Sequence, residues 1–394
     1  MQKAEIVIIG AGVVGASVAY HLTRRGARDV LLLERAAAQG AGSTGRATGG
    51  VRAQFETEIN IRMSIYSLEF FRQCEFDCGY EPRGYLFFGT DERQFEYLRR
   101  NVERQKSLGV EDVWTVDREA IAEICPILNC ADIAGGAFGA RDGFIDPLAV
   151  MRGFTAGAAQ GGARLELGTE VLSIETKGGK VSAVETARGR VECGAVVLAT
   201  GAHARELAAT AGVELPVAPQ KRQIVWARSA DPLPENTPMV IDLGSGFHFR
   251  PARDFLDARV NADNREVLFA YPDNGADDGG GACDTEFEPS FIDKVYERAR
   301  HRSPFLHRTT PVLSRCRAGL YENTPDHHAI LGRGEVENLF FANGFSGHGV
   351  MHSPATGRAL AEIVLDGEAS FLDVSCLRLE RFAKGALLHE TAFI

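Results

Sequence analysis

Three glycines, Gly10, Gly12 and Gly15, form the G-x-G-x-x-G pattern that most restricts what this chain can fold into. A run of β-branched residues, Ile6 to Ile9, predicts a strand before them, and the apolar spacing of residues 16–25 predicts a helix after them. In such a unit the first glycine turns the chain, the second leaves room for a pyrophosphate and the third lets the helix approach the strand. The free N–H groups at the helix start then attract the phosphates.

A second apolar run, Val30 to Leu33, predicts the next strand, which ends at Glu34. An acid about 20 residues beyond the last glycine accepts the hydroxyls of an adenosine ribose and repels a 2′-phosphate, which disfavours NADP. Together these features predict a dinucleotide-binding βαβ unit. The alternative is a glycine-rich turn that only packs a helix tightly.

The composition is that of an ordinary globular protein, long enough for two domains. The chain has 394 residues, of which 45% are hydrophobic and 24% charged, and its formal net charge is −10. This balance argues against nucleic acid or an anionic membrane as the main partner. No apolar stretch reaches the ~18–20 residues of a membrane span, and no signal-peptide pattern is present, so we expect a cytoplasmic protein. The spacing of its eight cysteines predicts reduced thiols and no metal site.

Two further segments join a strand to small residues. Residues 36–50 form a glycine-rich loop that either lines the cofactor or is a flexible surface loop. The apolar run 195–199 predicts a buried strand, separate from one at 190–193, whose end at 200–202 faces the cofactor.

The last third of the chain repeats the strand, glycine loop and helix of the opening. Residues 339–342 predict a strand, 343–349 a glycine loop and 354–365 a helix, whereas 317–331 is dense in loop residues. Between these parts lies a mixed region with four strand candidates: 223–227, 239–243, 246–250 and 267–271.

Five segments carry a resemblance to a known family: Gly10–Gly15 with Glu34, Gly42–Ala47, Val196–Ala202, Gly319–Asp326 and Asn343–Pro354. In them the chain resembles the FAD-dependent amine and amino-acid oxidoreductases of the D-amino-acid oxidase superfamily. The similarity is greatest to the branch of the sarcosine oxidase β-subunit, the proline and hydroxyproline dehydrogenases and dimethylglycine dehydrogenase.

The resemblance implies an α/β fold with an α+β second domain. A Rossmann-like FAD-binding domain would be built from the discontinuous segments 1–80, 141–220 and 310–394. A substrate domain, from segments 81–140 and 221–309, would cover the flavin with an antiparallel sheet.

The resemblance also implies the residues that contact FAD. Those expected at the pyrophosphate and adenosine are Gly10, Gly12, Val14, Gly15, Glu34, Arg35 and Val171. Those expected to reach the pyrophosphate, ribityl chain or flavin are Ser43, Thr44, Arg46, Ala47, Thr200 and Gly201. Those expected at the pyrimidine end of the flavin, where N–H groups stabilise the charge of the reduced ring, are Gly347, His348, Gly349 and Met351.

Departures from the family pattern also predict chemistry. Monomeric sarcosine oxidases attach the flavin to a cysteine where this chain has Gly319, and Cys316 is three residues away, so we expect non-covalent FAD. Met351 replaces a lysine of those oxidases that meets the substrate carboxylate. Their oxygen-activating lysine has no equivalent in residues 250–262, which favours a dehydrogenase over an oxidase.

The implied reaction is hydride transfer from a C–H bond next to nitrogen to flavin N5, which gives an imine. The substrate is a secondary amine or amino acid, similar to sarcosine, proline or a D-amino acid. Its carboxylate would need an arginine fork, with Arg52 first and Arg250 and Arg317 next. Other residues expected in the pocket are His248, Tyr271 and His352. The alternatives are ion-paired arginines and core histidines.

Two other functions remain open at this stage. The chain is the flavin subunit of a larger complex that passes electrons to a partner, or it is a non-catalytic FAD-bound assembly protein. We expect the electron acceptor to be oxygen, a protein or a quinone. A homo-oligomer and a hetero-oligomer both remain open.

Overall fold

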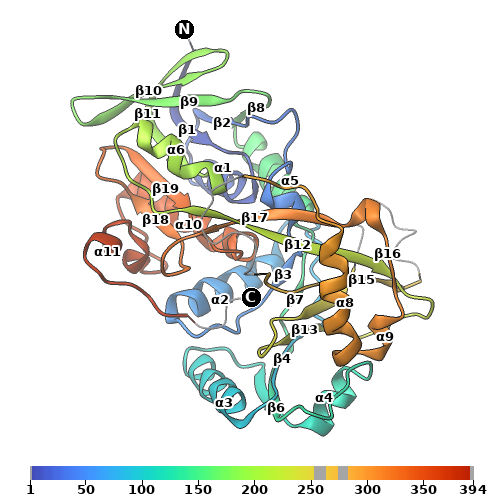
Figure 1. Ribbon diagram of the computed structural model, residues 1–394. Helices are drawn as coiled ribbons and strands as arrows, with labels where there is room; N and C mark the ends of the chain where they lie inside the picture. The colour runs from blue at the N-terminus through green and yellow to red at the C-terminus, as the bar shows by residue number, and fades with distance from the viewer. Residues whose placement is uncertain (1, 253–262, 274–282, 391–394) are drawn as a thin grey trace.

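The computed structural model describes residues 2–252, 263–273 and 283–390. The segment 250–262, in which the sequence has no counterpart of the oxygen-activating lysine, lies partly outside these residues. The described strands form two large sheets and a small ribbon of β3 (Gly50–Val51) with β7 (Gly143–Phe144). Figure 1 shows the first sheet in the upper part of the molecule and the second in the lower part.

The first sheet contains the predicted βαβ unit at its centre. β1 pairs in parallel with β2 on one side and β11 on the other, and α1 (Val13–Arg24) connects β1 to β2. The described part of the chain contributes eight strands to this sheet: β1 (Gln2–Ile9), β2 (Val30–Leu33), β8 (Arg164–Glu166), β9 (Val171–Lys177), β10 (Lys180–Thr186), β11 (Gly189–Leu198), β18 (Ile330–Arg333) and β19 (Leu339–Asn343).

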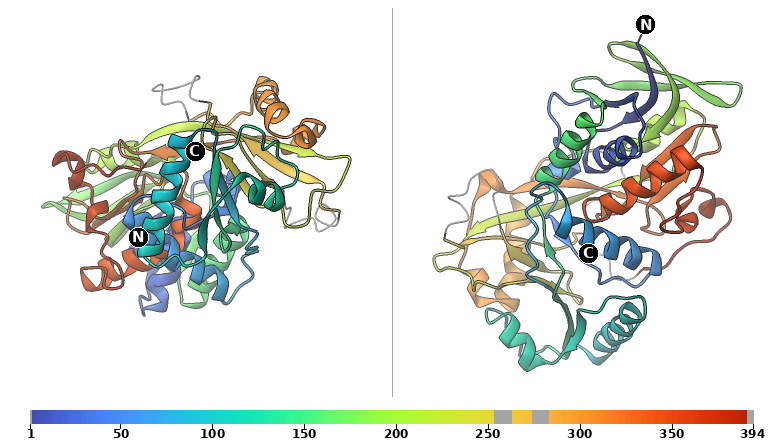
Figure 2. Two further views of the ribbon diagram at one scale, coloured as in Figure 1. Left: turned by 90° about the horizontal axis from the view of Figure 1, so that it is seen from below. Right: turned by 180° about the vertical axis from the view of Figure 1, so that it is seen from behind.

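Both faces of this sheet are covered, which explains why its central strands are apolar throughout. Ile6 and Ile8 of β1 belong to a core shared with helices, whereas Val7 and Ile9 belong to the opposite core, below α6 (Ala204–Thr210) and the β9–β10 hairpin. The right view in Figure 2 shows the helices of the first face side by side. They are α1, α2 (Glu58–Gln73), α5 (Pro147–Gln160) and α10 (Gly349–Asp366).

The second sheet is mainly antiparallel, with one parallel pair of β4 and β13. The described residues supply nine strands: β4 (Tyr85–Gly89), β5 (Val113–Val116), β6 (Gly135–Gly139), β12 (Ala218–Arg228), β13 (Met239–Asp242), β14 (His248–Pro251), β15 (Glu266–Ala270), β16 (Thr310–Pro311) and β17 (Arg317–Asn323). The remaining helices of the described residues are α3 (Glu92–Ser107), α4 (Arg118–Ile124), α8 (Ser290–Arg302), α9 (Pro304–His307) and α11 (Glu380–Ala383). Of these, α11 packs with Phe382 against the core of the first sheet.

The paired strands β12 and β17 run from one sheet towards the other (Figure 1). The expected FAD-binding segments supply the first sheet, and the expected substrate segments supply most of the second. The exact boundaries between the domains stay a prediction.

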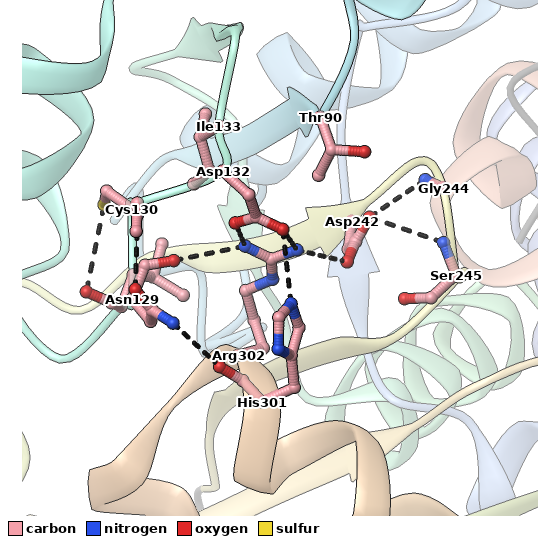
Figure 3. Close-up of polar contacts among 12 residues, drawn as sticks. Thr90, Asn129, Cys130, Asp132, Ile133, Asp242, Gly244, Ser245, His301 and Arg302 are labelled. Carbon is pink, nitrogen blue, oxygen red and sulfur yellow. Dashed lines mark hydrogen bonds and ion pairs between the residues drawn. The ribbon is translucent and has the colours of Figure 1, made fainter.

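A buried arginine ties the second sheet to its helix α8. The Arg302 side chain is 3% exposed and donates to Oδ1 of Asp132 (2.7 Å) and to Oδ2 of Asp242 (3.1 Å), as Figure 3 shows. Its Nη1 also donates to the Asn129 carbonyl. Because both carboxylates come from other elements, one guanidinium joins α8, β13 and the loop before β6.

Three sequence predictions were wrong in their boundaries. The strands expected at 190–193 and 195–199 are one strand, β11. The segment 317–331, expected to be loop, holds β17 and part of β18, because β17 has polar side chains and lacks a simple apolar alternation. The helix expected from Pro354 begins at Gly349.

Helix α10 accommodates Pro354 through a local hydrogen bond. Proline has no N–H for the Val350 carbonyl, and the Ser353 hydroxyl donates to that carbonyl instead (2.8 Å). Among the described residues, no helix is both long and apolar enough for a membrane span.

Candidate active site

A cavity of about 940 Å³ connects the two sheets. At one end it is lined by Ile9, Leu33 and Ala199, which lie at the carboxyl ends of β1, β2 and β11. At the other end it is lined by Tyr85 of β4 and Met239 of β13. The carboxyl ends of parallel strands are where ligands bind in open α/β sheets.

The glycines of the opening motif leave no space for side chains. Gly10 has φ +96°, and a Cβ atom there would lie 2.4 Å from the Ala199 carbonyl oxygen. A Cβ atom at Gly15 would lie 1.9 Å from the Gly10 carbonyl oxygen, so Gly15 sets the approach of α1 to the turn. The first N–H of α1, on Val13, donates to Oγ1 of Thr44 (3.1 Å). The helix start therefore opens onto the cavity beside the glycine loop.

The predicted adenosine residues lie at the outer part of the same end. The Glu34 carboxylate accepts N–H groups of Ala11 (3.1 Å) and Ala36 (3.0 Å), which fix it at the cavity wall. The Arg35 guanidinium lies 2.7 Å from Nε2 of His203, and burial lowers the pKa of that histidine. Glu34 is thus held by main-chain donors with its side chain facing the cavity.

The glycine loop 36–50 lines the cavity and is fixed to β17. It contains the short helix η1 (Ser43–Arg46). The Ser43 hydroxyl donates to the Leu320 carbonyl (2.8 Å), and Nη1 of Arg46 donates to the Ala318 carbonyl (2.7 Å). These contacts exclude the alternative of a loose surface loop for this part of the segment.

The residues at the cavity fit a dinucleotide cofactor. The starts of both α1 and α10 lie at the cavity wall, which places two sets of helix N–H groups towards it. The Oγ1 atom of Thr200 is buried and has no hydrogen-bond partner among the described residues, although it lines the cavity. A bound hydroxyl or phosphate oxygen would satisfy this atom.

The start of α10 is shaped by a glycine turn. Gly347 has φ +93°, and a Cβ atom there would lie 2.6 Å from the Tyr321 ring. His348, Gly349 and Met351 line the cavity next to it. Burial lowers the pKa of His348 well below its usual value, so its ring is neutral at physiological pH.

The far end of the cavity carries a buried arginine. The Arg52 side chain lies over Phe55, with Cζ 4.0 Å from the ring centroid, and 5.1 Å from that of Phe87. One Nη1 hydrogen bond goes to the Gln54 carbonyl. Burial lowers the pKa of Arg52, but an arginine at this site stays charged. Anionic ligands are therefore favoured at this end.

Two other predicted residues, His248 and Tyr271, also line the cavity. Nδ1 of His248 donates to the Gly246 carbonyl (2.9 Å), so Nε2 is the acceptor in the neutral ring. Burial lowers the pKa of His248 to about 4, which makes it a weak base. Tyr271 stacks on Phe291 at 5.3 Å.

Most of the sequence-predicted site residues come together in this cavity. Those that line it are Gly10, Gly12, Val14, Glu34, Arg35, Ser43, Thr44, Arg46, Ala47, Arg52, Val171, Thr200, Gly201, His248, Tyr271, Gly319, Gly347, His348, Gly349 and Met351. Their individual roles stay predictions.

Four predicted residues do not belong to the described wall of the cavity. Arg250, a further candidate for the substrate carboxylate, donates from Nε to the Thr48 carbonyl (2.8 Å). Gly15 packs behind the glycine turn. Arg317 donates to the carbonyls of Arg46 (3.2 Å) and Ala47 (3.1 Å), so it supports the glycine loop from outside. His352 is buried against the Ser64 hydroxyl (2.9 Å), and burial lowers its pKa to about 3.

Sequence reasoning missed several residues of the wall. Arg222, Tyr321 and Glu322 face the cavity from β12 and β17, and Tyr85 and Met239 from β4 and β13. Tyr321 and Glu322 stand inside the Gly319–Asp326 segment that carried the family resemblance, and this is the signal that was available. The others carry no local pattern, because only the sheet brings them together.

Comparison with known proteins places this site in a family. The model of the DAO family, described as FAD dependent oxidoreductase, matches residues 5–363. FAD-dependent oxidoreductase domain-containing protein 1 of Bos taurus is 30% identical over 440 residues, which cover 99% of this chain and 87% of that protein.

Two relatives have names that describe a reaction. Human mitochondrial dimethylglycine dehydrogenase is 29% identical over 399 residues, which cover 97% of this chain and 45% of that protein. The crystal structure of L-proline dehydrogenase from P. horikoshii superposes with a TM-score of 0.88 at 30% identity and covers 98% of this chain and 100% of that one. The chain belongs to the DAO family of FAD-dependent oxidoreductases, and its cofactor is FAD.

Proposed function

We propose that this flavoenzyme oxidises a secondary amine or amino acid that carries a carboxylate, as sarcosine, proline and D-amino acids do. The observation that carries the proposal is the buried Arg52 at the far end of the cavity that begins at Gly10. The names of two relatives, dimethylglycine dehydrogenase and L-proline dehydrogenase, support this substrate class.

The side chains of the far end suit an amine that is held by its carboxylate. When bound, FAD supplies a hydride acceptor for the C–H bond next to the substrate nitrogen, and an imine results. Arg52 offers a fork of N–H donors to a carboxylate, on a support of aromatic rings that limits its movement. Tyr85, Met239 and Ile241 provide apolar surface that excludes water.

The protonation states at this end favour a neutral substrate amine. His248 has a pKa of about 4 and is neutral at physiological pH, so it accepts a hydrogen bond better than it accepts a proton. We infer that the substrate loses its ammonium proton to solvent before or during binding. A rise in kcat/KM with pH, up to the pKa of the substrate amine, is the expected profile.

Replacement of Arg52 tests the proposal. In Arg52→Ala, KM for the best substrate should rise about 100-fold while FAD stays bound, because a charge-assisted carboxylate contact is lost. Arg52→Lys, the matched control, keeps the positive charge but loses the fork of N–H donors. Its KM should lie between those of the wild type and Arg52→Ala. Unchanged KM in both variants, at normal flavin content, would remove Arg52 from substrate binding.

We further propose that FAD is bound without a covalent link. Gly319 lines the cavity opposite Arg46 and offers no nucleophile, and the Cys316 thiol donates to the Trp226 carbonyl (3.7 Å). Acid precipitation should therefore release all of the flavin into the supernatant. Yellow colour that remains in the washed precipitate would contradict this proposal.

The electron acceptor is proposed to be a protein or quinone rather than oxygen. By the family resemblance, the oxygen-activating lysine of the related oxidases is expected near residues 250–262, and the sequence has no lysine in this stretch. Flavin reduced under anaerobic conditions should then react slowly when air is admitted. Rapid release of peroxide by the isolated chain would favour an oxidase.

A further inference from the structure

Glu322 is an ionisable residue of the cavity that has no part in the function proposed above. Glu322 lies on β17 and lines the cavity between two glycine turns. Its Oε2 accepts the N–H of Gly344 (3.0 Å), in the turn after β19. On the other side, a Cβ atom at Gly201 would lie 3.7 Å from the same oxygen. The carboxyl therefore joins the ends of β19 and β11 at the cofactor cavity.

Glu322 also fixes the turn that leads into α10. Its main-chain carbonyl accepts the N–H of Ser346 (3.2 Å), so both its side chain and its backbone hold residues 344–346. Three residues later, Gly349 begins α10, whose first N–H groups are directed to the cavity. A change at Glu322 is thus transmitted to the residues expected at the flavin.

The environment of Glu322 makes its charge adjustable. Burial raises its pKa to about 7, and the N–H groups of Gly344 and Phe345 oppose this rise. Glu322 lines the cavity, so a bound cofactor would desolvate the carboxyl further. We therefore expect the Glu322 carboxyl of the FAD-loaded protein to titrate at or above neutral pH.

The other charged groups around it keep a constant state in this range. The charged and titratable side chains on the elements packed against β17 are Arg46 of η1, Lys221, Arg222 and Arg228 of β12, His203 of η2 (Gly201–His203) and His348 before α10. Burial lowers the pKa of both histidines, so they are neutral above pH about 6.5, and the arginines and the lysine stay charged.

We propose that Glu322 is a proton-accepting residue of the flavin site: it takes up a proton when the bound cofactor gains negative charge on reduction, and it positions the 344–346 turn in either state. The physical reason is repulsion between like charges. A negative charge that develops in the cavity disfavours the Glu322 carboxylate and favours its neutral acid. By linkage, the neutral acid favours the reduced cofactor to the same extent.

The step balances as follows. In turnover the amine would deliver two electrons and one proton to the flavin as a hydride, whereas in a titration dithionite supplies the two electrons and solvent supplies the proton. A second proton passes from solvent to the Glu322 carboxylate, and no bond other than O–H is made there. Reduction of the site therefore takes up about two protons for two electrons between the pKa values of Glu322 in the oxidised and reduced states, and about one outside this range.

Proton uptake by the FAD-loaded protein tests the proposal. The protein is reduced anaerobically with dithionite at a series of pH values from about 6 to 9, and the midpoint potential is measured at each. The slope should correspond to about two protons per two electrons just above neutral pH and fall to about one at the alkaline end. A slope of one throughout would overturn the proposal.

Two variants separate Glu322 from the flavin itself, whose own protonation also consumes a second proton. Glu322→Gln keeps an acceptor for the Gly344 N–H but does not titrate, so its slope should be about one proton at all pH values. Glu206→Gln, the matched control, changes an exposed carboxylate of α6, and its slope should equal that of the wild type. A two-proton slope that persists in Glu322→Gln would assign the second proton to the flavin and contradict the proposal.

The result does not depend on the substrate, because dithionite supplies the electrons. If Glu322→Gln fails to retain FAD, proton uptake by the wild type is followed with an indicator dye, and infrared difference spectra of the same reduction are recorded. A carboxylic acid C=O band that appears on reduction supports the proposal. Its absence contradicts it.

Discussion

The two ends of the cavity are built from different parts of the chain. At the dinucleotide end the wall consists of main-chain groups at glycine turns, such as Gly10 and Gly347, next to helix starts. At the substrate end it consists of side chains, such as Arg52 and Tyr85, from strands far apart in sequence. A ligand phosphate needs N–H groups, which every residue except proline supplies, whereas a substrate needs particular side chains. FAD binding should therefore be sensitive to any atom added at the glycine turns. Substrate binding should depend on the residues that hold the side chains of the other end in place.

The largest expected effect is on the dinucleotide end, when one methyl group is added. Gly10→Ala places a Cβ atom 2.4 Å from the Ala199 carbonyl oxygen, so the turn must shift and FAD affinity should fall about 100-fold. Flavin content and the dissociation constant of added FAD measure this change.

Gly26→Ala is the matched control for this prediction. Gly26 has the same φ, +96°, but an added Cβ atom there meets nothing within 4 Å. The variant therefore carries only the strain of a left-handed residue, about 1–2 kcal/mol of stability, and should bind FAD normally. Equal loss of FAD in both variants would contradict a steric role of Gly10.

At the substrate end, a buried carboxyl should make stability depend on pH. Asp142 accepts the Ala53 N–H (2.8 Å) and Nε2 of Gln54 (2.9 Å), beside Arg52, and burial raises its pKa to about 7. The unfolded chain loses this proton near pH 3.8, so between pH about 4 and 7 the folded protein holds a proton that the unfolded chain lacks. The stability contributed by Asp142 therefore falls as pH rises through this window.

Replacement of Asp142 should remove this dependence. Between pH 5 and 7 the wild type should lose about 2 kcal/mol more than Asp142→Asn, whose side chain does not titrate. Urea unfolding at several pH values measures the difference, and the contribution of Glu322 cancels because both proteins carry it. Parallel stability curves would show that Asp142 is ionised in the folded state.

The smallest expected effect concerns the end of the chain. The Glu390 carboxylate accepts the N–H groups of Glu56 (2.8 Å) and Thr57 (3.0 Å), so it fixes the two residues before α2, next to the segment that carries Arg52. Glu390→Ala should lower the free energy of unfolding by about 1 kcal/mol and raise KM slightly at unchanged FAD content. Glu380→Gln, in an exposed ion pair with Lys384, is the control and should change neither. Lower FAD content without a change in KM would contradict this placement.

The difference between the two ends of the cavity also explains which parts of the structure could be predicted from the sequence. The βαβ unit depends on residues that are neighbours in the sequence, so β2 lies where the apolar run Val30–Leu33 predicts it. Most of the residues predicted to bind the cofactor line the cavity, and they stand in or near the motifs that carry the family resemblance. Arg222 and Met239 could not be found, because strand pairing alone brings them to the cavity.

Two errors have a related cause. Arg317 and His352 belong to residue types expected in a substrate pocket, but their side chains bind the Arg46 and Ala47 carbonyls and Ser64, respectively. Residue type therefore indicates a role only where tertiary contacts leave the side chain facing the ligand.

The central claim is that one cavity holds FAD at its glycine end and a carboxylate-bearing amine at its arginine end. Anaerobic mixing of the FAD-loaded protein with a panel of N-methyl, cyclic and D-amino acids, followed at the flavin absorbance band, tests it most directly. The account predicts that at least one of these compounds bleaches the flavin, and that the matching amine without a carboxylate does so at least about tenfold less effectively. A flavin that stays oxidised with every member of the panel would contradict it.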